Sequence, residues 1–116
     1  MSSSIPEPDW RIFQTLHPIW VNRFCERVNG ELIAVLSDPR RNQHDRYLAA
    51  YRLIHKRDKQ IGHAFDDFRR STAVFQIAII RKLGVITDEE LGRFGKEVRT
   101  SLAIFCAEDH GSAAEG

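Results

Sequence analysis

The chain has 116 residues, of which 42% are hydrophobic and seven are phenylalanine, so we expect one folded domain rather than a disordered segment. The net charge of +1 does not by itself imply an acidic or basic partner. The charge is unevenly distributed, with −2 over residues 1–39, +7 over residues 40–82 and −4 over residues 83–116. A basic middle between acidic flanks indicates charge matching within the chain or between chains.

Cysteine usage and hydropathy suggest a cellular location. Cys25 and Cys106 lie in separate predicted helices among apolar neighbours, so we expect two reduced, buried thiols. The first residues have no charged and apolar pattern typical of a signal peptide. The longest apolar run, residues 102–107, is far shorter than the ~18 residues of a membrane span. We therefore expect a cytoplasmic protein that does not contact a membrane.

The N-terminal third predicts an arm and two helices. Residues 1–8 contain three serines and two prolines and predict a flexible arm. Asp9 is suited to cap a short helix through Leu16, which the His17-Pro18 pair should end because the residue before proline avoids the α region. A second helix is predicted over residues 18–36.

An apolar stripe with alternating steps of four and three residues organises the centre of the chain. This spacing keeps one side of a helix facing a partner. It predicts a long helix over about residues 42–83, capped by Asn42 or Asp38, that either breaks near Gly62 or protrudes to meet a second subunit. Its apolar members are Tyr47, Tyr51, Ile54, Ile61, Phe65, Phe68, Phe75 and Ile79.

The last third predicts one more helix. Gly84 should end the central helix. Thr87 and Glu90 have the spacing of a capping box, which predicts a helix start at residue 88. The helix is expected to run to residue 106, although Gly92 and Gly95 are suited to split it, and residues 108–116 are expected to form a flexible tail. The domain then covers residues 9–107.

Asp58 interrupts the apolar stripe. A buried carboxylate needs a partner, and the candidates are Arg23, Arg27 or a copy of the same helix in a dimer. The favoured interpretation is a buried ion pair that sets helix register. The alternatives are partial exposure near a kink and a functional acid.

Histidine and carboxylate spacing gives weaker hypotheses. His63 has Asp66 and Asp67 within helical reach, and His55 lies two turns earlier, but a di-iron bundle needs further Glu-x-x-His pairs. The two cysteines lie far apart in the sequence and neither has a second cysteine nearby, so a zinc site is not expected. We therefore expect no metal, cofactor or catalytic residue, and retain an enzyme that uses Asp58, His55 and His63 as a remote alternative.

Nucleic-acid binding is the stronger alternative, because phosphate contacts by cations dominate such affinity. The aromatic residues of the stripe are not interleaved with the cations, however, which argues against base stacking. The candidate basic surface is Arg40, Arg41, Arg52, Lys56, Arg57, Arg69 and Arg70.

These patterns together predict an all-α fold without a β-sheet: an antiparallel bundle of four or five helices around the helix at 42–83. The stripe is longer than its flanking helices can cover, so we expect a homodimer or another protein partner, and a regulatory, non-enzymatic function. The predicted interface is Tyr47, Tyr51, Ile54, Ile61, Phe65 and Phe68.

Overall fold

A computed structural model describes the backbone of residues 4–113 and the side chains of residues 4–105. The described chain is all α-helical, and no strand occurs in it, as predicted. The elements in chain order are α1 (Glu7–Leu36), α2 (Gln43–Phe65), a 3₁₀ turn (Arg70–Thr72), α3 (Ala73–Lys82), α4 (Asp88–Leu91) and α5 (Lys96–Ala113).

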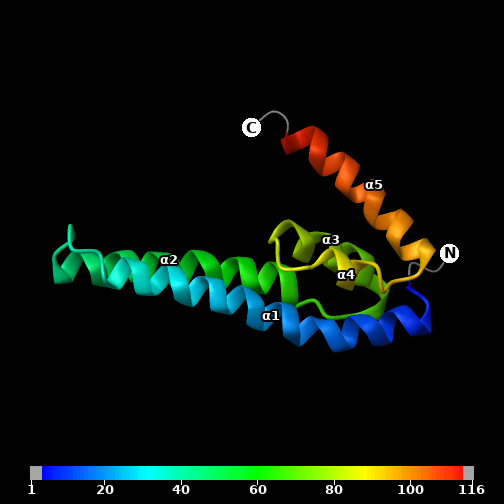
Figure 1. Cartoon of the computed structure of the whole chain (residues 1–116), viewed down its shortest axis with the longest axis horizontal. Coiled ribbons are helices and arrows are strands. Elements are labelled where there is room, and N and C mark those ends of the chain that lie inside the picture. The colour runs from blue at the N-terminus through cyan, green and yellow to red at the C-terminus, as the bar shows by residue number, and fades with distance from the viewer. Residues whose placement is uncertain (1–3, 114–116) are drawn as a thin grey trace.

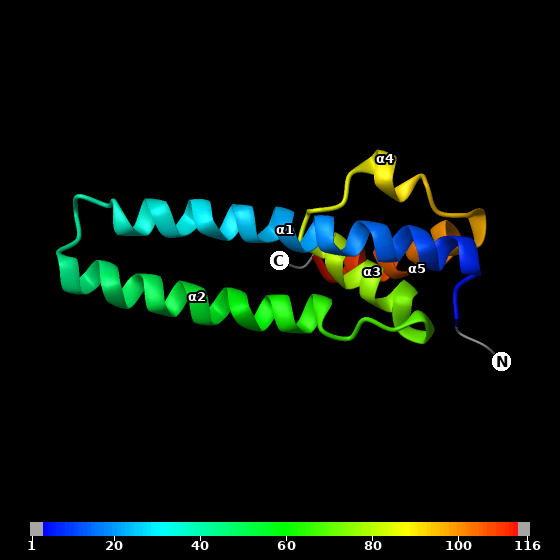
Figure 2. The same cartoon turned by 90° about the horizontal axis from the view of Figure 1, so that it is seen from below.

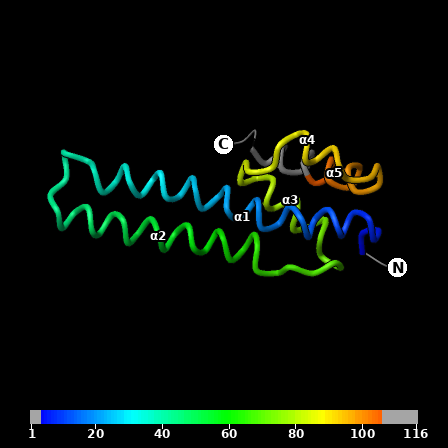
Figure 3. Tube along the Cα trace, turned by 60° about the horizontal axis from the view of Figure 1, so that its bottom comes forward, coloured from blue at the N-terminus to red at the C-terminus, as the bar shows by residue number. Residues whose placement is uncertain are grey.

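Two long antiparallel helices, α1 and α2, dominate the shape (Figures 1 and 2). The molecule is 55 Å long and 33 by 25 Å across. At one end, which we call the head, α3 and α4 pack against the N-terminal half of α1, and α5 packs against α3. The other end holds only the second half of α1 and most of α2, and this two-helix arm extends away from the head in every view (Figure 3).

Helix α1 continues through Pro18, so the predicted break at His17-Pro18 is wrong. The reason is visible in the spacing of its buried residues, which keep one helical face on both sides of the proline. Burial of this face compensates for the backbone hydrogen bond that proline cannot donate. The buried residues are Asp9, Phe13, Leu16, Trp20, Phe24 and Val28.

The range 42–83 holds two helices rather than one, and the break falls at residues 66–69, just after the predicted position at Gly62. His17 explains the position of the break, because its Nε2 lies 3.2 Å from the carbonyl oxygen of Phe65, at the end of α2. Phe68 then packs on His17, with ring centroids 4.2 Å apart. The apolar stripe therefore continues beyond the end of α2, where Phe68 covers the aromatic residues of α1.

Of the predicted helix boundaries in the last third, the stop at Gly84 and the start at residue 88 are confirmed. Gly84 has a φ of +75° and follows α3, and the side chains of Thr87 and Glu90 form the capping box of α4. The glycines split the last helix as proposed, with α5 beginning after Gly95. Helix α5 continues to Ala113, so residues 108–113 are helical where a tail was expected. Residues 114–116 of that expected tail lie outside the described residues.

The flexible segment predicted over residues 1–8 is also shorter than expected. Ile5 is 3% exposed and belongs to the core, and its carbonyl oxygen accepts a hydrogen bond from Arg70 Nε. Helix α1 begins at Glu7 with Pro6 as its N-cap, so Asp9 does not cap it. The buried Asp9 carboxylate instead accepts a hydrogen bond from the backbone N–H of Gly95, at the start of α5. Residues 1–3 of the expected arm lie outside the described part.

Candidate interaction surface

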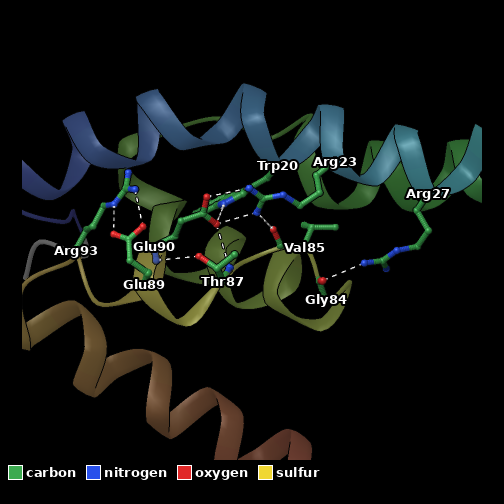
Figure 4. Close-up of polar contacts among 9 residues, drawn as sticks. All are labelled: Trp20, Arg23, Arg27, Gly84, Val85, Thr87, Glu89, Glu90 and Arg93. Atoms are coloured by element: carbon green, nitrogen blue, oxygen red, sulfur yellow. Dashed lines mark hydrogen bonds and ion pairs between the residues drawn. The ribbon is translucent and has the colours of Figure 1, made fainter.

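Glu90, on α4, is a buried carboxylate that links α1 to the head (Figure 4). Its carboxylate accepts hydrogen bonds from Trp20 Nε1 at 3.0 Å and from Arg23 at 2.9 and 3.1 Å. It also accepts a hydrogen bond from the backbone N–H of Thr87. Arg23 and Arg27 reach carbonyl oxygens that follow α3, at Val85 and at Leu83 and Gly84.

The role of the Glu90 cluster follows from its charges. The side-chain hydrogen bond from Arg23 is the main cause that lowers the pKa of Glu90 to about 2, against the opposing effect of burial. A carboxylate with so low a pKa is a poor proton acceptor near neutral pH. The role of the cluster is therefore structural: it stabilises the packing of the head against α1.

A second ion pair holds the arm together. Arg57 of α2 donates two hydrogen bonds to the carboxylate of Glu31 on α1, with N–O distances of 3.0 and 2.7 Å. This paired geometry is the strongest that arginine makes with a carboxylate, and it lowers the pKa of Glu31. Ala50 is buried on the same side of α2 as Arg57. These contacts fix which side of α2 faces α1.

One side of the arm carries an apolar surface, which we call the arm face. It contains two shallow hollows of about 280 and 300 Å³ that meet at Ile54. The most exposed apolar side chains on it are Tyr47 (65%), Tyr51 (62%), Ile54 (51%) and Leu36 (51%). The two hollows are lined by Cys25, Val28, Asn29, Leu32 and Leu36 of α1 and by Gln43, Arg46, Tyr47, Ala50, Tyr51, Ile54, Arg57, Asp58 and Ile61 of α2.

The arm face points away from the head. Arg27 reaches toward the head, and Asn29 follows it by two residues, which is a rotation of about 200° around an α-helix. Figure 1 shows the head on one side of the α1–α2 pair, and in Figure 2 α1 passes in front of part of α3 and α5. No described element covers the arm face.

The interpretation of Asp58 as a residue buried within the chain is wrong. Asp58 is exposed on the arm face, and neither Arg23 nor Arg27 is its partner because both bind the head. This exposure agrees with the alternative of an exposed Asp58, and the other candidate partner, a copy of the same helix, lies outside the single chain. The sequence pattern misled because it placed Asp58 on the packed side of α2, whereas that side is set by Ala50 and Arg57.

The other candidate polar residues are not buried either. His55, His63 and Asp66 are exposed, and Asp67 is half-buried. Asp67 binds Arg69 at 2.6 Å, which is the main cause of its lowered pKa, and Asp66 forms the C-cap of α2. Among the described side chains no group of three or more His, Cys, Asp or Glu residues has the geometry of a metal site.

Ion pairs occupy most of the candidate basic surface. Arg40 and Arg41 both bind Asp38, whose pKa falls to about 2 chiefly through the hydrogen bond from Arg40. Arg57 binds Glu31, and the cations at 69 and 70 bind Asp67 and Glu7. Arg52 and Lys56, with the neighbouring Lys59, remain as exposed cations of α2.

The predicted interface divides into two parts. Tyr47, Tyr51 and Ile54 are exposed and Ile61 is half-buried, all on the arm face. Phe65, at 5% exposure, belongs to the core, which removes it as an interface residue, and Phe68 packs on α1 while keeping 38% exposure.

Periodicity did not identify the contribution of α1 to the arm face. Cys25 was expected in the core but is half-buried beside Asn29 and Leu32, whereas the side chain of Cys106 lies outside the described residues. One feature of the sequence could have indicated this contribution: Cys25 and Leu36 lie beside, rather than within, the buried stripe of α1.

A separate hollow of about 330 Å³ lies in the head between the N-terminal segment, α3 and α5. Ile5, Phe75 and Phe105 form its apolar part, and Ser4, Ser71, Thr72, Ser101 and Glu97 contribute polar atoms. Among the described residues, no histidine, cysteine or lysine lines this hollow.

The fold and the arm face together define a class: an all-α protein with a helical head and a two-helix arm. No protein-family model, curated protein or solved structure matches this chain. Within the described residues, none of the helices is long and apolar enough to span a membrane.

Proposed function

We propose that this is a non-enzymatic, regulatory protein that acts through protein–protein contacts and that its arm face binds a second copy of the chain. The observation that carries the proposal is the uncovered apolar surface of the arm. Side chains such as Tyr47, Tyr51 and Ile54 are grouped on one side, and grouped apolar exposure is typical of interaction sites. Tyrosine is also enriched in interfaces.

The size of the arm face is suited to a dimer. Residues 43–61 of α2 span about 27 Å, and two adjacent helices are about 20 Å wide. The face therefore offers roughly 540 Å² per copy, or about 1,000 Å² in a dimer, which reaches the lower limit for specific interfaces. Two such arms packed face to face form a four-helix bundle, the standard way to bury a two-helix surface.

The proposed location is the cytoplasm, where reduced thiols such as Cys25 persist.

Light scattering behind a sizing column tests this function. The expected mass of the wild-type protein is about twice 13.4 kDa. Ile54→Lys should convert it to a folded monomer, because a charge is placed at the centre of the arm face. Ile104→Lys is the matched control, since Ile104 is 59% exposed on α5, away from the arm. A wild-type monomer would refute self-association.

Nucleic-acid binding is a second candidate. Arg52, Lys56 and Lys59 are exposed and follow one another on α2 at steps of four and three. The ion pairs of the other cations give this candidate less support. Its signature is nucleic acid that co-elutes with the protein and is removed by high salt. Catalysis has the least support, because Asp58, His55 and His63 are all exposed side chains.

A further inference from the structure

The residues of the arm face on α2 lie at equal or nearly equal distances on the two sides of Ile54. Tyr47 precedes it by seven residues and Ile61 follows it by seven. Tyr51 precedes it by three residues and Asp58 follows it by four. In a twofold dimer each contact of residue i with residue j occurs twice, so a surface of this kind can match itself when the second copy runs in the opposite direction.

We propose that two copies pack arm to arm with α2 antiparallel to α2 of the partner and with Ile54 at the twofold axis. This arrangement rests on the proposed function and specifies its geometry. It places Tyr47 opposite Ile61 of the second copy. It also places Tyr51 opposite Asp58, so that the tyrosine hydroxyl donates a hydrogen bond to the carboxylate in each half of the interface.

Charge and exposure favour this arrangement over one in which α2 covers α1 of the second copy. Asp58 is the carboxylate of the arm face, and it has no bond to Arg23 or Arg27. Removing it from water is costly unless a donor meets it. The hydroxyl of Tyr51 is such a donor, and its ring is already stacked on His55 with the planes 6° apart. The residues that α1 contributes to the arm face are Cys25, Val28, Asn29, Leu32 and Leu36, and none of them carries a charge that could pair with Asp58.

The positions of the heads are compatible with the arrangement. The arm face points away from the head, so the two heads lie on the outer sides of the dimer and at opposite ends (Figure 1). The resulting bundle has four helices, with the Arg57–Glu31 pairs on the contacts between α1 and α2 within each copy. The proposed dimer therefore leaves that ion pair intact.

Single-cysteine cross-linking tests the orientation. In a Cys25→Ser, Cys106→Ser background whose mass is first measured, Ile54→Cys should form a disulfide-linked dimer on mild oxidation, because the two copies of position 54 meet at the axis. Tyr47→Cys alone should not, but an equimolar mixture of Tyr47→Cys and Ile61→Cys should. Efficient cross-linking of Tyr47→Cys to itself would overturn the antiparallel arrangement and leave self-association standing. A dimer in which none of these positions cross-links would also overturn it, whereas a monomeric wild type and background would refute the proposed function.

A double-mutant cycle tests the hydrogen bond. Tyr51→Phe and Asp58→Asn should each weaken the dimer about tenfold, since a hydrogen bond to a charged group is lost. The double variant should have about the same dissociation constant as either single variant, because both changes remove the same hydrogen bond. Arg52→Ala, on the outer side of α2, should leave the dissociation constant unchanged. Additive losses in the double variant would overturn the Tyr51–Asp58 contact.

Discussion

Glu90 shows how much of this fold depends on one side chain. It completes the capping box of α4, and the same carboxylate binds Trp20 and Arg23 on α1. The exposed fraction of its side chain is 8%. A buried carboxylate with these donors is stabilised, but removal of either charge would strand the other. Glu90 therefore links the start of one short helix to the longest helix of the molecule.

Glu90→Gln should lower the free energy of unfolding by about 3 kcal/mol near neutral pH, because Arg23 loses its charged partner. The effect should depend on pH. The pKa of Glu90 is about 2 in the folded chain against 4.5 for the free group, so its stabilisation is complete above pH 4.5 and is lost as the pH falls toward 2. Urea titrations of both proteins at several pH values should show the difference between them shrinking toward zero. A difference that is independent of pH would contradict the role given to the ionised Glu90.

At the scale of the elements, the glycine inside α1 and the glycine that follows α3 have different backbone conformations. Gly30 lies inside α1, and a Cβ added there would meet nothing within 4 Å. Gly84 follows α3 with a φ of +75°, a conformation that side chains with a Cβ adopt at a cost. Identical substitutions at the two positions should therefore have opposite effects on stability.

Gly30→Ala should stabilise the protein by about 1 kcal/mol, because alanine is the better helix former and the site has space. Gly84→Ala should destabilise it by about 1 kcal/mol, since the left-handed conformation becomes strained. Thermal unfolding followed by circular dichroism measures both. Destabilisation by Gly30→Ala would mean that the arm needs flexibility or a close backbone contact at this position.

The whole molecule combines a well-packed head with an arm that exposes tyrosine and isoleucine. A surface of this kind gains stability when a second copy covers it, because binding to the folded state alone raises its apparent stability. The unfolding temperature should consequently rise with protein concentration. A hundredfold concentration range measured by differential scanning calorimetry should show this rise for the wild type and not for Ile54→Lys. A constant unfolding temperature for the wild type would argue against self-association.

The fold class and several helix boundaries were predictable from local signals. The Thr87–Glu90 capping box, the terminating Gly84 and the Asn42 cap each depend on neighbours within a few residues, and all are confirmed. The exposure of Tyr47, Tyr51 and Ile54 is consistent with the prediction that the stripe is longer than its flanking helices can cover. Local chemistry and helical spacing thus determined the elements and the apolar surface that remains.

Only the tertiary structure decided how those elements pair. Pro18 predicted a break on local grounds, but burial of one continuous face from Phe13 to Val28 outweighs the lost backbone bond. The end of α2 depends on His17, which lies 48 residues away in the sequence, and no periodicity can register such a contact. Asp58 and Phe65 occupy the same stripe, yet one is exposed and the other buried, because the stripe crosses from the arm into the head.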